Sequence, residues 1–120
     1  MLVPVATLAD TTDQALADYR AQGAGTFDGD AGRRLWNTEQ STADRTTRSC
    51  VSCHGADPTR PGRHVRTDET IKPMAPSINP KRLTERREIE KWFLRNCKWT
   101  FGRECSAQEK GDILSYLRRQ

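Results

Sequence analysis

Cys50, Cys53 and His54 stand together in the segment Cys-Val-Ser-Cys-His, which has the pattern C-x-x-C-H. This pattern is the attachment signature of c-type haem: each thiol adds to one vinyl group of the porphyrin, and the imidazole becomes the proximal ligand of the iron. The two residues between the cysteines match the separation of the vinyl groups and leave His54 directed at the metal. The motif therefore predicts one covalent haem c, attached at Cys50 and Cys53 and ligated by His54.

The pair Cys50 and Cys53 has three other interpretations. A thioredoxin-like redox pair lies beside a βαβ pattern, and no convincing strand is visible in this sequence. A zinc site needs a second close pair, but Cys97 and Cys105 are separated by seven residues, longer than the usual spacing. A disulfide between Cys50 and Cys53 is the third alternative. Haem is favoured because a large apolar macrocycle also supplies buried surface that a short polar chain lacks.

Cys97 and Cys105 remain once the first two cysteines are assigned to haem. C-type haem is attached outside the reducing cytoplasm, where disulfides persist. The even remainder therefore favours a disulfide that closes the loop Lys-Trp-Thr-Phe-Gly-Arg-Glu, and two free buried thiols are the alternative. The same reasoning predicts an exported, periplasmic protein.

The second axial ligand of the iron decides the function, and the sequence offers three candidates. Met74 lies in a proline-braced loop, Lys-Pro-Met-Ala-Pro, and its thioether would give an ordinary electron-transfer cytochrome. His64 lies among Arg63, Val65 and Arg66, where a solvated histidine is the more frequent role. Asn96 carries a carboxamide, which from composition alone ranks below Met74 as a ligand because such residues usually satisfy a helix end or a core hydrogen bond.

The composition bounds the architecture. The chain has 120 residues, with 34% hydrophobic and 30% charged residues, enough for one small domain. Its longest apolar stretch, at residues 1–6, is far shorter than the roughly 20 residues that a membrane span needs, so no integral membrane segment is expected. The net charge of +4 is too mild to indicate nucleic-acid binding. Residues 1–10 are expected to be a disordered start or the remnant of an export signal, and residues 11–120 a single domain.

The elements that must position these residues are helices. Apolar spacing and capping residues predict four helical stretches, at about residues 12–22, 30–40, 84–95 and 106–117. Ser106 begins a capping box, Ser-Ala-Gln-Glu, in which Glu109 reaches back to the helix start. Asn96 continues the apolar face of the third helix. Residues 55–80 carry five of the six prolines and are expected to form a long irregular loop around something.

Three longer segments carry a family resemblance: Cys50 to Gly62, Thr67 to Thr84, and Glu90 to Lys110. Together they resemble the SHP (sphaeroides haem protein) family of small monohaem cytochromes c. The match runs from about Tyr19 to Leu117 in the same order, and its Arg-Asn-Cys and Gly-Arg-Glu-Cys motifs are far more specific than C-x-x-C-H. The loop around His64 is about one residue longer than the family pattern.

The resemblance implies an all-α fold similar to class I cytochromes c, with about four helices around one covalent haem and a long irregular distal loop. It implies that Asn96 ligates the ferric iron through its side chain and leaves on reduction. It also implies that Cys97 and Cys105 form the family's disulfide, and that Met74 packs in the distal loop. The related cytochromes c-double-prime carry histidine at the position of Asn96, so a bis-histidine haem is not implied.

The expected function is one-electron transfer by a cytochrome whose ferrous haem binds O2 or NO after Asn96 is released. The alternatives are a plain Met74-ligated electron carrier and a haem enzyme that reduces oxygen or nitric oxide. An enzyme is not favoured, because a carboxamide cannot act as a general base. The resemblance implies a dihaem cytochrome c as redox partner. Six basic residues could steer an acidic partner; they are Arg60, Arg63, Arg66, Lys72, Lys81 and Arg82.

Overall fold

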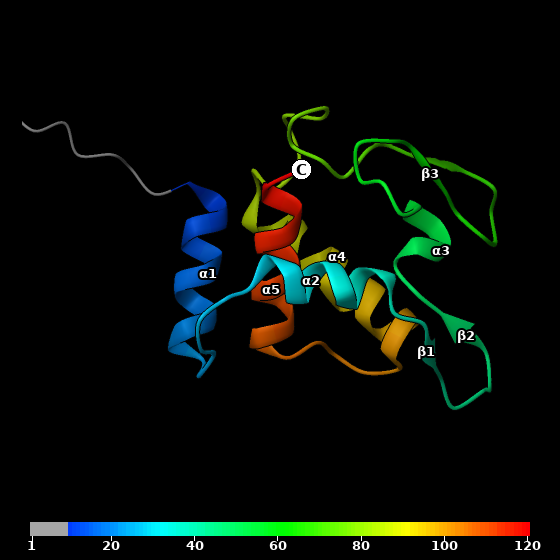
Figure 1. The fold of residues 1–120 in the computed structure, drawn as a ribbon, viewed down its shortest axis with the longest axis horizontal. Helices are drawn as coiled ribbons and strands as arrows, with labels where there is room; N and C mark the ends of the chain where they lie inside the picture. The colour runs from blue at the N-terminus through cyan, green and yellow to red at the C-terminus, as the bar shows by residue number, and fades with distance from the viewer. Residues whose placement is uncertain (1–9) are drawn as a thin grey trace, which may run out of the picture.

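The computed structural model describes residues 10–120, and its regular structure is mostly helical (Figure 1). The helices are α1 (Thr11–Ala21), α2 (Gly29–Asn37), α3 (Val51–His54), α4 (Arg86–Phe101) and α5 (Ala107–Arg118). The all-α fold expected from the sequence is confirmed, with the short α3 as an addition to the four predicted helices. The predicted disordered start or signal remnant lies outside the described residues, except for Asp10, which belongs to the fold.

The first two helices begin at aspartate caps. The Asp10 side chain accepts a hydrogen bond from the backbone N–H of Asp13 at 2.7 Å, and that of Asp28 accepts one from Asp30 at 2.9 Å. Each carboxylate satisfies an amide that the helix leaves unpaired and also faces the positive end of the helix dipole. Both helices consequently begin one residue before the predicted starts at about residues 12 and 30.

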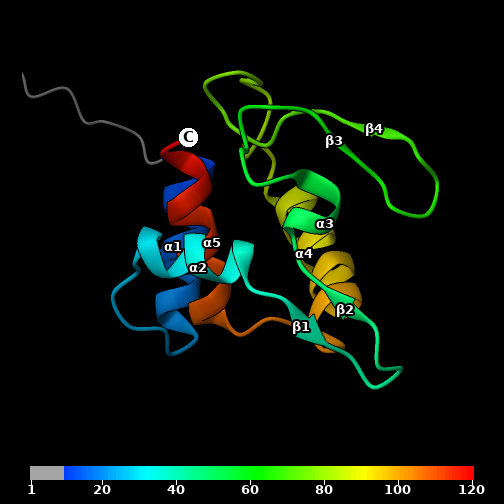
Figure 2. The ribbon, with the colours of Figure 1, turned by 45° about the vertical axis from the view of Figure 1, so that its right-hand side comes forward.

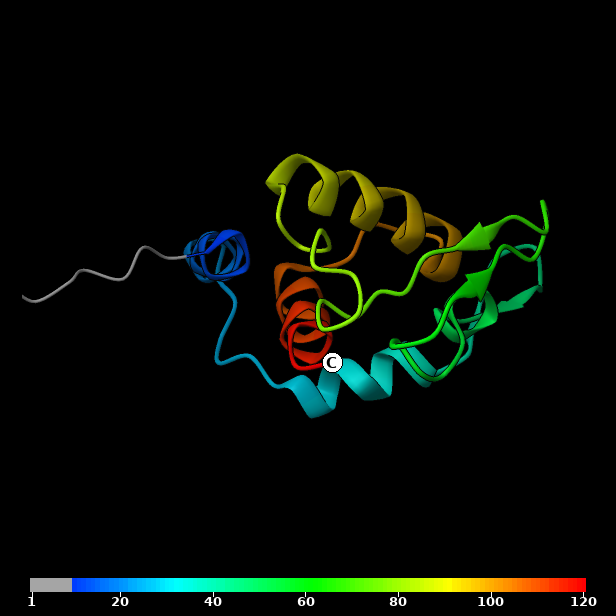
Figure 3. The ribbon, with the colours of Figure 1, turned by 90° about the horizontal axis from the view of Figure 1, so that it is seen from above.

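Helix α5 lies at the centre of the helical part, with α2 on one side and α4 on the other (Figure 3). Helices α1 and α2 both pack against it. Gly32 makes the α2 contact possible, because a Cβ atom there would lie 2.0 Å from the carbonyl oxygen of Asp112. One buried cluster joins α1, α4 and α5 around Leu16, Tyr19 and Leu114, and a second joins Trp36 of α2 to the apolar face of α5.

Helix α4 is longer than predicted. The expected end at Arg95 is wrong, since the helix continues to Phe101 and stops at Gly102, which has φ +72° and tolerates this left-handed conformation. Asn96 and Cys97 therefore lie inside a helix. In the view of Figure 2, α3 lies in front of α4. Strands β1 (Gln40–Ser41) and β2 (Thr47–Arg48) contact α4.

Two short antiparallel hairpins interrupt the loops. Strands β1 (Gln40–Ser41) and β2 (Thr47–Arg48) pair before the haem motif, and β3 (Gly62–Arg63) and β4 (Thr70–Ile71) pair after it. The expectation that the chain forms no strand is wrong at these two places. Strands of two residues are too short to show an alternating pattern, so their pairing depends on the loop geometry rather than on a sequence signal.

Candidate functional site: a haem-attachment motif and its distal helix

The C-x-x-C-H motif forms the single turn of α3. Cys50 precedes the turn, and its carbonyl oxygen accepts a hydrogen bond from the backbone N–H of His54 at 3.0 Å. Both Cys50 and Cys53 are free thiols, so the alternative of a disulfide between them is not realised. Strand β3 fixes the turn from outside, because a Cβ atom on Gly62 would lie 2.2 Å from the carbonyl oxygen of Cys53. This turn therefore presents the two cysteines and the histidine from one rigid unit.

His54 is held in an apolar environment. Its ring lies 5.1 Å from the ring of Trp36, and the Trp36 indole N–H donates to the carbonyl oxygen of Gly55 at 3.2 Å. Burial, helped by the positive charge of Arg82, lowers the pKa of His54 to about 4. The imidazole is therefore neutral at physiological pH and keeps a lone pair, which a metal ligand requires.

Two observations at α3 fit a covalent haem. The Nδ1 atom of His54 is buried and has no hydrogen-bond partner among the described residues, so the described chain leaves a polar atom of this ring unsatisfied. Burial raises the pKa of Cys50 to about 11, so its thiol stays protonated rather than forming a thiolate suited to zinc. Across the described part of the chain, no group of three or more His, Cys, Asp or Glu side chains could hold a metal ion. The residues thus suit haem better than zinc.

His64 is occupied within the β3–β4 hairpin. Its Nδ1 atom accepts hydrogen bonds from the backbone N–H groups of Arg66 at 3.1 Å and Thr67 at 3.3 Å. The side chain therefore stabilises the hairpin turn, a local role that the surrounding basic residues do not reveal.

Met74 is half-buried and packs against the cluster that contains Trp36, Ile113, Tyr116 and Leu117. The neighbouring Ala75 is fully buried, and its N–H donates to the carbonyl oxygen of Pro58 at 2.9 Å. Met74 thus packs against core side chains from a loop that is tied down, which agrees with a packing role.

Asn96 differs from His64 and Met74 in its surroundings. It lies in the middle of α4, it is exposed, and its side chain donates to and accepts from no described residue in a hydrogen bond. The expectation that it continues a buried apolar face is wrong: Ile89 and Cys97 are buried, whereas Trp92 on the same side as Asn96 is 43% exposed. The face of α4 is therefore divided into a core side and a side that carries Trp92 and Asn96.

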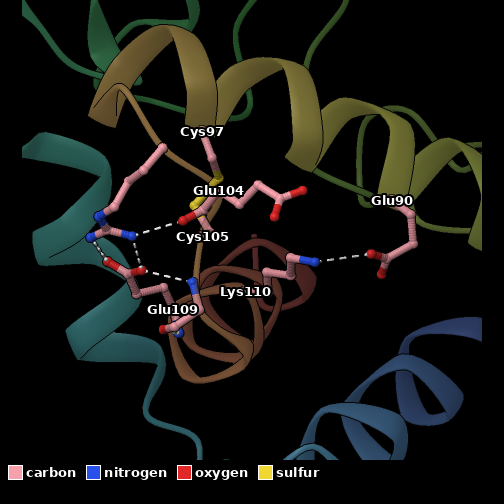
Figure 4. Close-up of a disulfide and its surroundings, with 8 residues drawn as sticks. Glu90, Cys97, Glu104, Cys105, Glu109 and Lys110 are labelled. Carbon is pink, nitrogen blue, oxygen red and sulfur yellow. Dashed lines mark hydrogen bonds and ion pairs between the residues drawn. A yellow bond between two sulfur atoms is a disulfide. The ribbon is translucent and has the colours of Figure 1, made fainter. Parts of the chain in front are cut away.

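A disulfide joins Cys97 in α4 to Cys105 just before α5 (Figure 4). Both cysteines are buried, and their Cα atoms are 5.6 Å apart. The bridge fixes the end of α4 to the start of α5 one residue away from Asn96. Beside it lies a hollow of about 210 Å³ whose lining includes Glu90, Cys105 and Lys110.

Sequence reasoning treated Arg82 only as a surface cation and gave Trp99 no role. Arg82 is half-buried, and its guanidinium donates to the carbonyl oxygens of Pro73 at 3.0 Å and Lys72 at 2.8 Å. The Trp99 indole stacks under Arg48 at 4.7 Å, and its buried N–H has no partner among the described residues. Position i+3 from Asn96 is the only signal in the sequence that Trp99 lies near the same side of α4.

Comparison with known proteins identifies the family. Residues 22–117 match the family model described as a domain of unknown function, DUF1924. The chain is 42% identical over 107 residues to the cytochrome c-type protein SHP of Cereibacter sphaeroides, covering 89% of this chain and 82% of that protein. It is also 33% identical over 86 residues to cytochrome c'' of Methylophilus methylotrophus, covering 72% of this chain and 60% of that protein.

The folds agree as well. A solved structure of oxidised SHP, described as an oxygen-binding cytochrome c, superposes with a TM-score of 0.85 at 42% identity and covers 93% of this chain and 100% of that one. The crystal structure of oxidised cytochrome c'' from Methylophilus methylotrophus gives a TM-score of 0.78 at 25% identity, covering 92% and 94% of the two chains. With a single C-x-x-C-H motif, the cofactor is one haem c. The chain belongs to the SHP family of c-type cytochromes.

Proposed function

We propose that this cytochrome transfers one electron and binds O2 or NO when reduced, with Asn96 as the side chain that changes position between the two states. When bound, haem c supplies a one-electron iron couple and a coordination position that can take up a diatomic gas. Cys50 and Cys53 would hold the group covalently, and His54 would ligate the iron from the α3 side. Membership of the SHP family makes the chain a c-type cytochrome, and the relatives it matches are cytochromes rather than enzymes.

The observation that carries this proposal is the contrast among the three candidate distal ligands. The Nδ1 atom of His64 is engaged by two backbone N–H groups, and Met74 is packed into a buried cluster. Only Asn96 has a side chain that is exposed and without a hydrogen-bond partner among the described residues. Asn96 can therefore move without breaking a hydrogen bond to the described residues, as a displaceable ligand must.

The chemistry of a carboxamide supports the same assignment. Its neutral oxygen is a hard and weak donor, better matched to ferric than to ferrous iron, so Asn96 is expected to bind in the oxidised protein and leave on reduction. The side-chain NH2 group could then donate a hydrogen bond to a gas molecule. The related SHP is itself described as oxygen-binding.

The proposal also covers the cellular compartment and the redox partner. Export to the periplasm is supported by the Cys97–Cys105 disulfide, because such bridges persist in oxidising compartments. No helix within residues 10–120 is long and apolar enough to cross a membrane. Electron exchange with a dihaem cytochrome c is supported by the family resemblance and by the basic residues of the loops.

Visible absorption spectra test the proposal directly. The purified haem protein is measured oxidised, then reduced without oxygen, then exposed to O2 and to NO, beside the variants Asn96→Val and Met74→Leu. We expect a high-spin ferrous form that shifts on adding gas, and an oxidised spectrum that changes in Asn96→Val but not in Met74→Leu. A low-spin ferrous form with a Met-to-iron band that disappears in Met74→Leu would instead establish the plain electron carrier. Steady-state consumption of O2 or NO with an electron donor would establish the enzyme.

A further inference from the structure

Arg82 is an exception among the half-buried arginines of this protein. The others each pair with a carboxylate: Arg48 with Asp44, Arg86 with Asp18 and Glu90, and Arg118 with Asp10 and Asp13. Arg82 is half-buried like these arginines, but it takes part in no ion pair with any residue from 10 to 120. A partly desolvated cation without an anion is unfavourable, so this position calls for a negative group from outside the polypeptide.

The guanidinium of Arg82 is oriented but not saturated. Its Nε and one terminal nitrogen donate to the carbonyl oxygens of Pro73 and Lys72, which fixes the plane of the group. The other terminal nitrogen, Nη1, donates to no group in the described chain. The fork geometry of arginine therefore leaves a directed donor for a planar anion such as a carboxylate.

The backbone places Arg82 beside the haem-attachment motif. The next residue, Leu83, adopts φ +60°, an uncommon conformation for a leucine, and packs against the same buried cluster as Cys50 and Val51. The carbonyl oxygens that Arg82 contacts belong to Lys72 and Pro73, directly before Met74, which packs against that same cluster. The other charged side chains between β4 and α4 are Lys72, Lys81 and Glu85. All three are exposed, and none of the described ion pairs joins Glu85 to Arg82. The surroundings that the structure describes thus offer Arg82 no protein anion.

We propose that Nη1 of Arg82 donates a hydrogen bond to a propionate of the haem, and that this propionate is the negative partner that Arg82 lacks within the described chain. Haem c carries two propionates, which are carboxylates of the planar kind that arginine prefers. The positive charge of Arg82 keeps the pKa of that propionate low. It also offsets the negative charge of the propionate, which would otherwise stabilise the ferric state. Arg82 is thus a positioning residue that raises the reduction potential and keeps the potential independent of pH near neutrality. The inference rests on haem attachment at α3 but not on gas binding.

Redox titration of the haem-loaded variants tests this role. In Arg82→Gln we expect the one-electron equilibrium to shift toward the ferric form by about tenfold, which corresponds to about 59 mV, and the potential to become pH-dependent between about pH 5 and 7. Arg82→Lys keeps a positive charge and should restore most of the potential. Arg118→Gln, which removes a half-buried arginine that already has protein partners, should leave the potential and its pH profile unchanged. Equal effects of Arg82→Gln and Arg118→Gln would overturn the proposal.

A measurement on the unaltered protein is decisive if Arg82→Gln does not fold. Haem labelled with ¹³C at the propionate carboxyls is followed by NMR as the pH is lowered. We expect one propionate to titrate well below the ordinary carboxyl range of about pH 4 to 5. Two propionates that titrate in the ordinary range, in a protein whose spectrum shows intact haem attachment, would refute the role of Arg82 without affecting the proposed function.

Discussion

Asn96 combines two properties that suit a displaceable ligand. Its side chain is exposed and unpaired within the described chain, while its backbone is fixed by α4 and by the disulfide at Cys97. A flexible side chain on a fixed backbone can switch between two positions with little reorganisation of the fold. This is the simplest physical basis for a ligand that leaves and returns with the redox state.

Asn96→Val should therefore separate the two roles of the carboxamide. We expect the oxidised haem protein to lose its distal protein ligand and shift toward a high-spin spectrum. We also expect O2 to dissociate from the reduced form about tenfold faster, because a hydrogen bond worth about 1.4 kcal/mol is lost. Stopped-flow absorbance measures both. Asn37→Val, at an exposed asparagine of α2, serves as the control, and a dissociation rate that is the same in all three proteins would exclude donation from Asn96.

The start of α5 is the best-defined element boundary in the fold. Ser106 accepts a hydrogen bond from the N–H of Glu109 at 3.1 Å, and Glu109 accepts from the N–H of Ser106 at 2.9 Å, so the capping box predicted from the sequence is confirmed. Arg103 adds a two-pronged contact to the Glu109 carboxylate at 2.8 and 3.0 Å. Residues before and after the turn thus hold the central helix at its N-terminus.

This boundary should be sensitive to pH. The hydrogen bonds from Arg103, opposed by burial and helped by the Ser106 N–H, lower the pKa of Glu109. Because the folded-state pKa lies below the unfolded one, the stabilisation is complete above the unfolded pKa of about 4.3 and is lost as the pH falls through the folded pKa. Glu109→Gln should reduce the free energy of unfolding by about 1 kcal/mol at pH 7 and by little at pH 3.

Urea denaturation at the two pH values measures the effect. Glu104→Gln is the control, because Glu104 is an exposed carboxylate of the same loop with no ion pair in the described chain. A destabilisation by Glu109→Gln that is equally large at pH 3 would show that the charge of Glu109 is not its cause.

The disulfide between α4 and α5 should affect both stability and ligand binding. Removing it in Cys97→Ser with Cys105→Ser should lower the free energy of unfolding by roughly 2 to 3 kcal/mol, the loop-closure value for such a short separation. Because Asn96 is adjacent to Cys97, the loss of the bridge should also change the gas affinity of the reduced protein. Denaturation and gas titration are run on the same samples. An unchanged gas affinity with reduced stability would show that the bridge does not restrain Asn96.

Across the whole molecule, the features that sequence reasoning predicts correctly are those encoded by near neighbours. The C-x-x-C-H turn and the Ser106 capping box each depend on four or five consecutive residues. The exposure of Asn96 and the isolation of Arg82 depend instead on which distant segments cover them. Helical periodicity assigns Asn96 to an apolar face, but only tertiary packing determines that Ile89 is covered and Trp92 is not. Likewise, no local pattern shows that Arg82 lacks a carboxylate partner.

The same distinction applies to the net charge of +4 and its use in partner recognition. Of the six basic residues expected to steer a partner, Arg60 and Arg63 pair with Asp57 and Asp68, and Arg82 is half-buried. The three that remain exposed and free of ion pairs in the described chain are Arg66, Lys72 and Lys81. Two of these, Lys72 and Lys81, flank the loop whose Met74 packs against the same buried cluster as Cys50 and Val51. Electrostatic steering by the loops must therefore depend on fewer basic residues than the sequence indicates.

Reversing the charges of both lysines, in a variant with Lys72→Glu and Lys81→Glu, should consequently slow electron transfer to an acidic surface. A carboxylate-terminated monolayer on a gold electrode provides such a surface without requiring the natural partner. We expect the wild-type rate to fall steeply as ionic strength rises from about 0.01 to 0.15 M, since the Debye length shrinks from about 30 to 8 Å, and the variant to be slower and nearly independent of salt. Arg20→Glu with Arg33→Glu makes the same charge change on exposed positions of α1 and α2. If this control slows transfer as much as the loop variant, then the net charge rather than the loop directs the encounter.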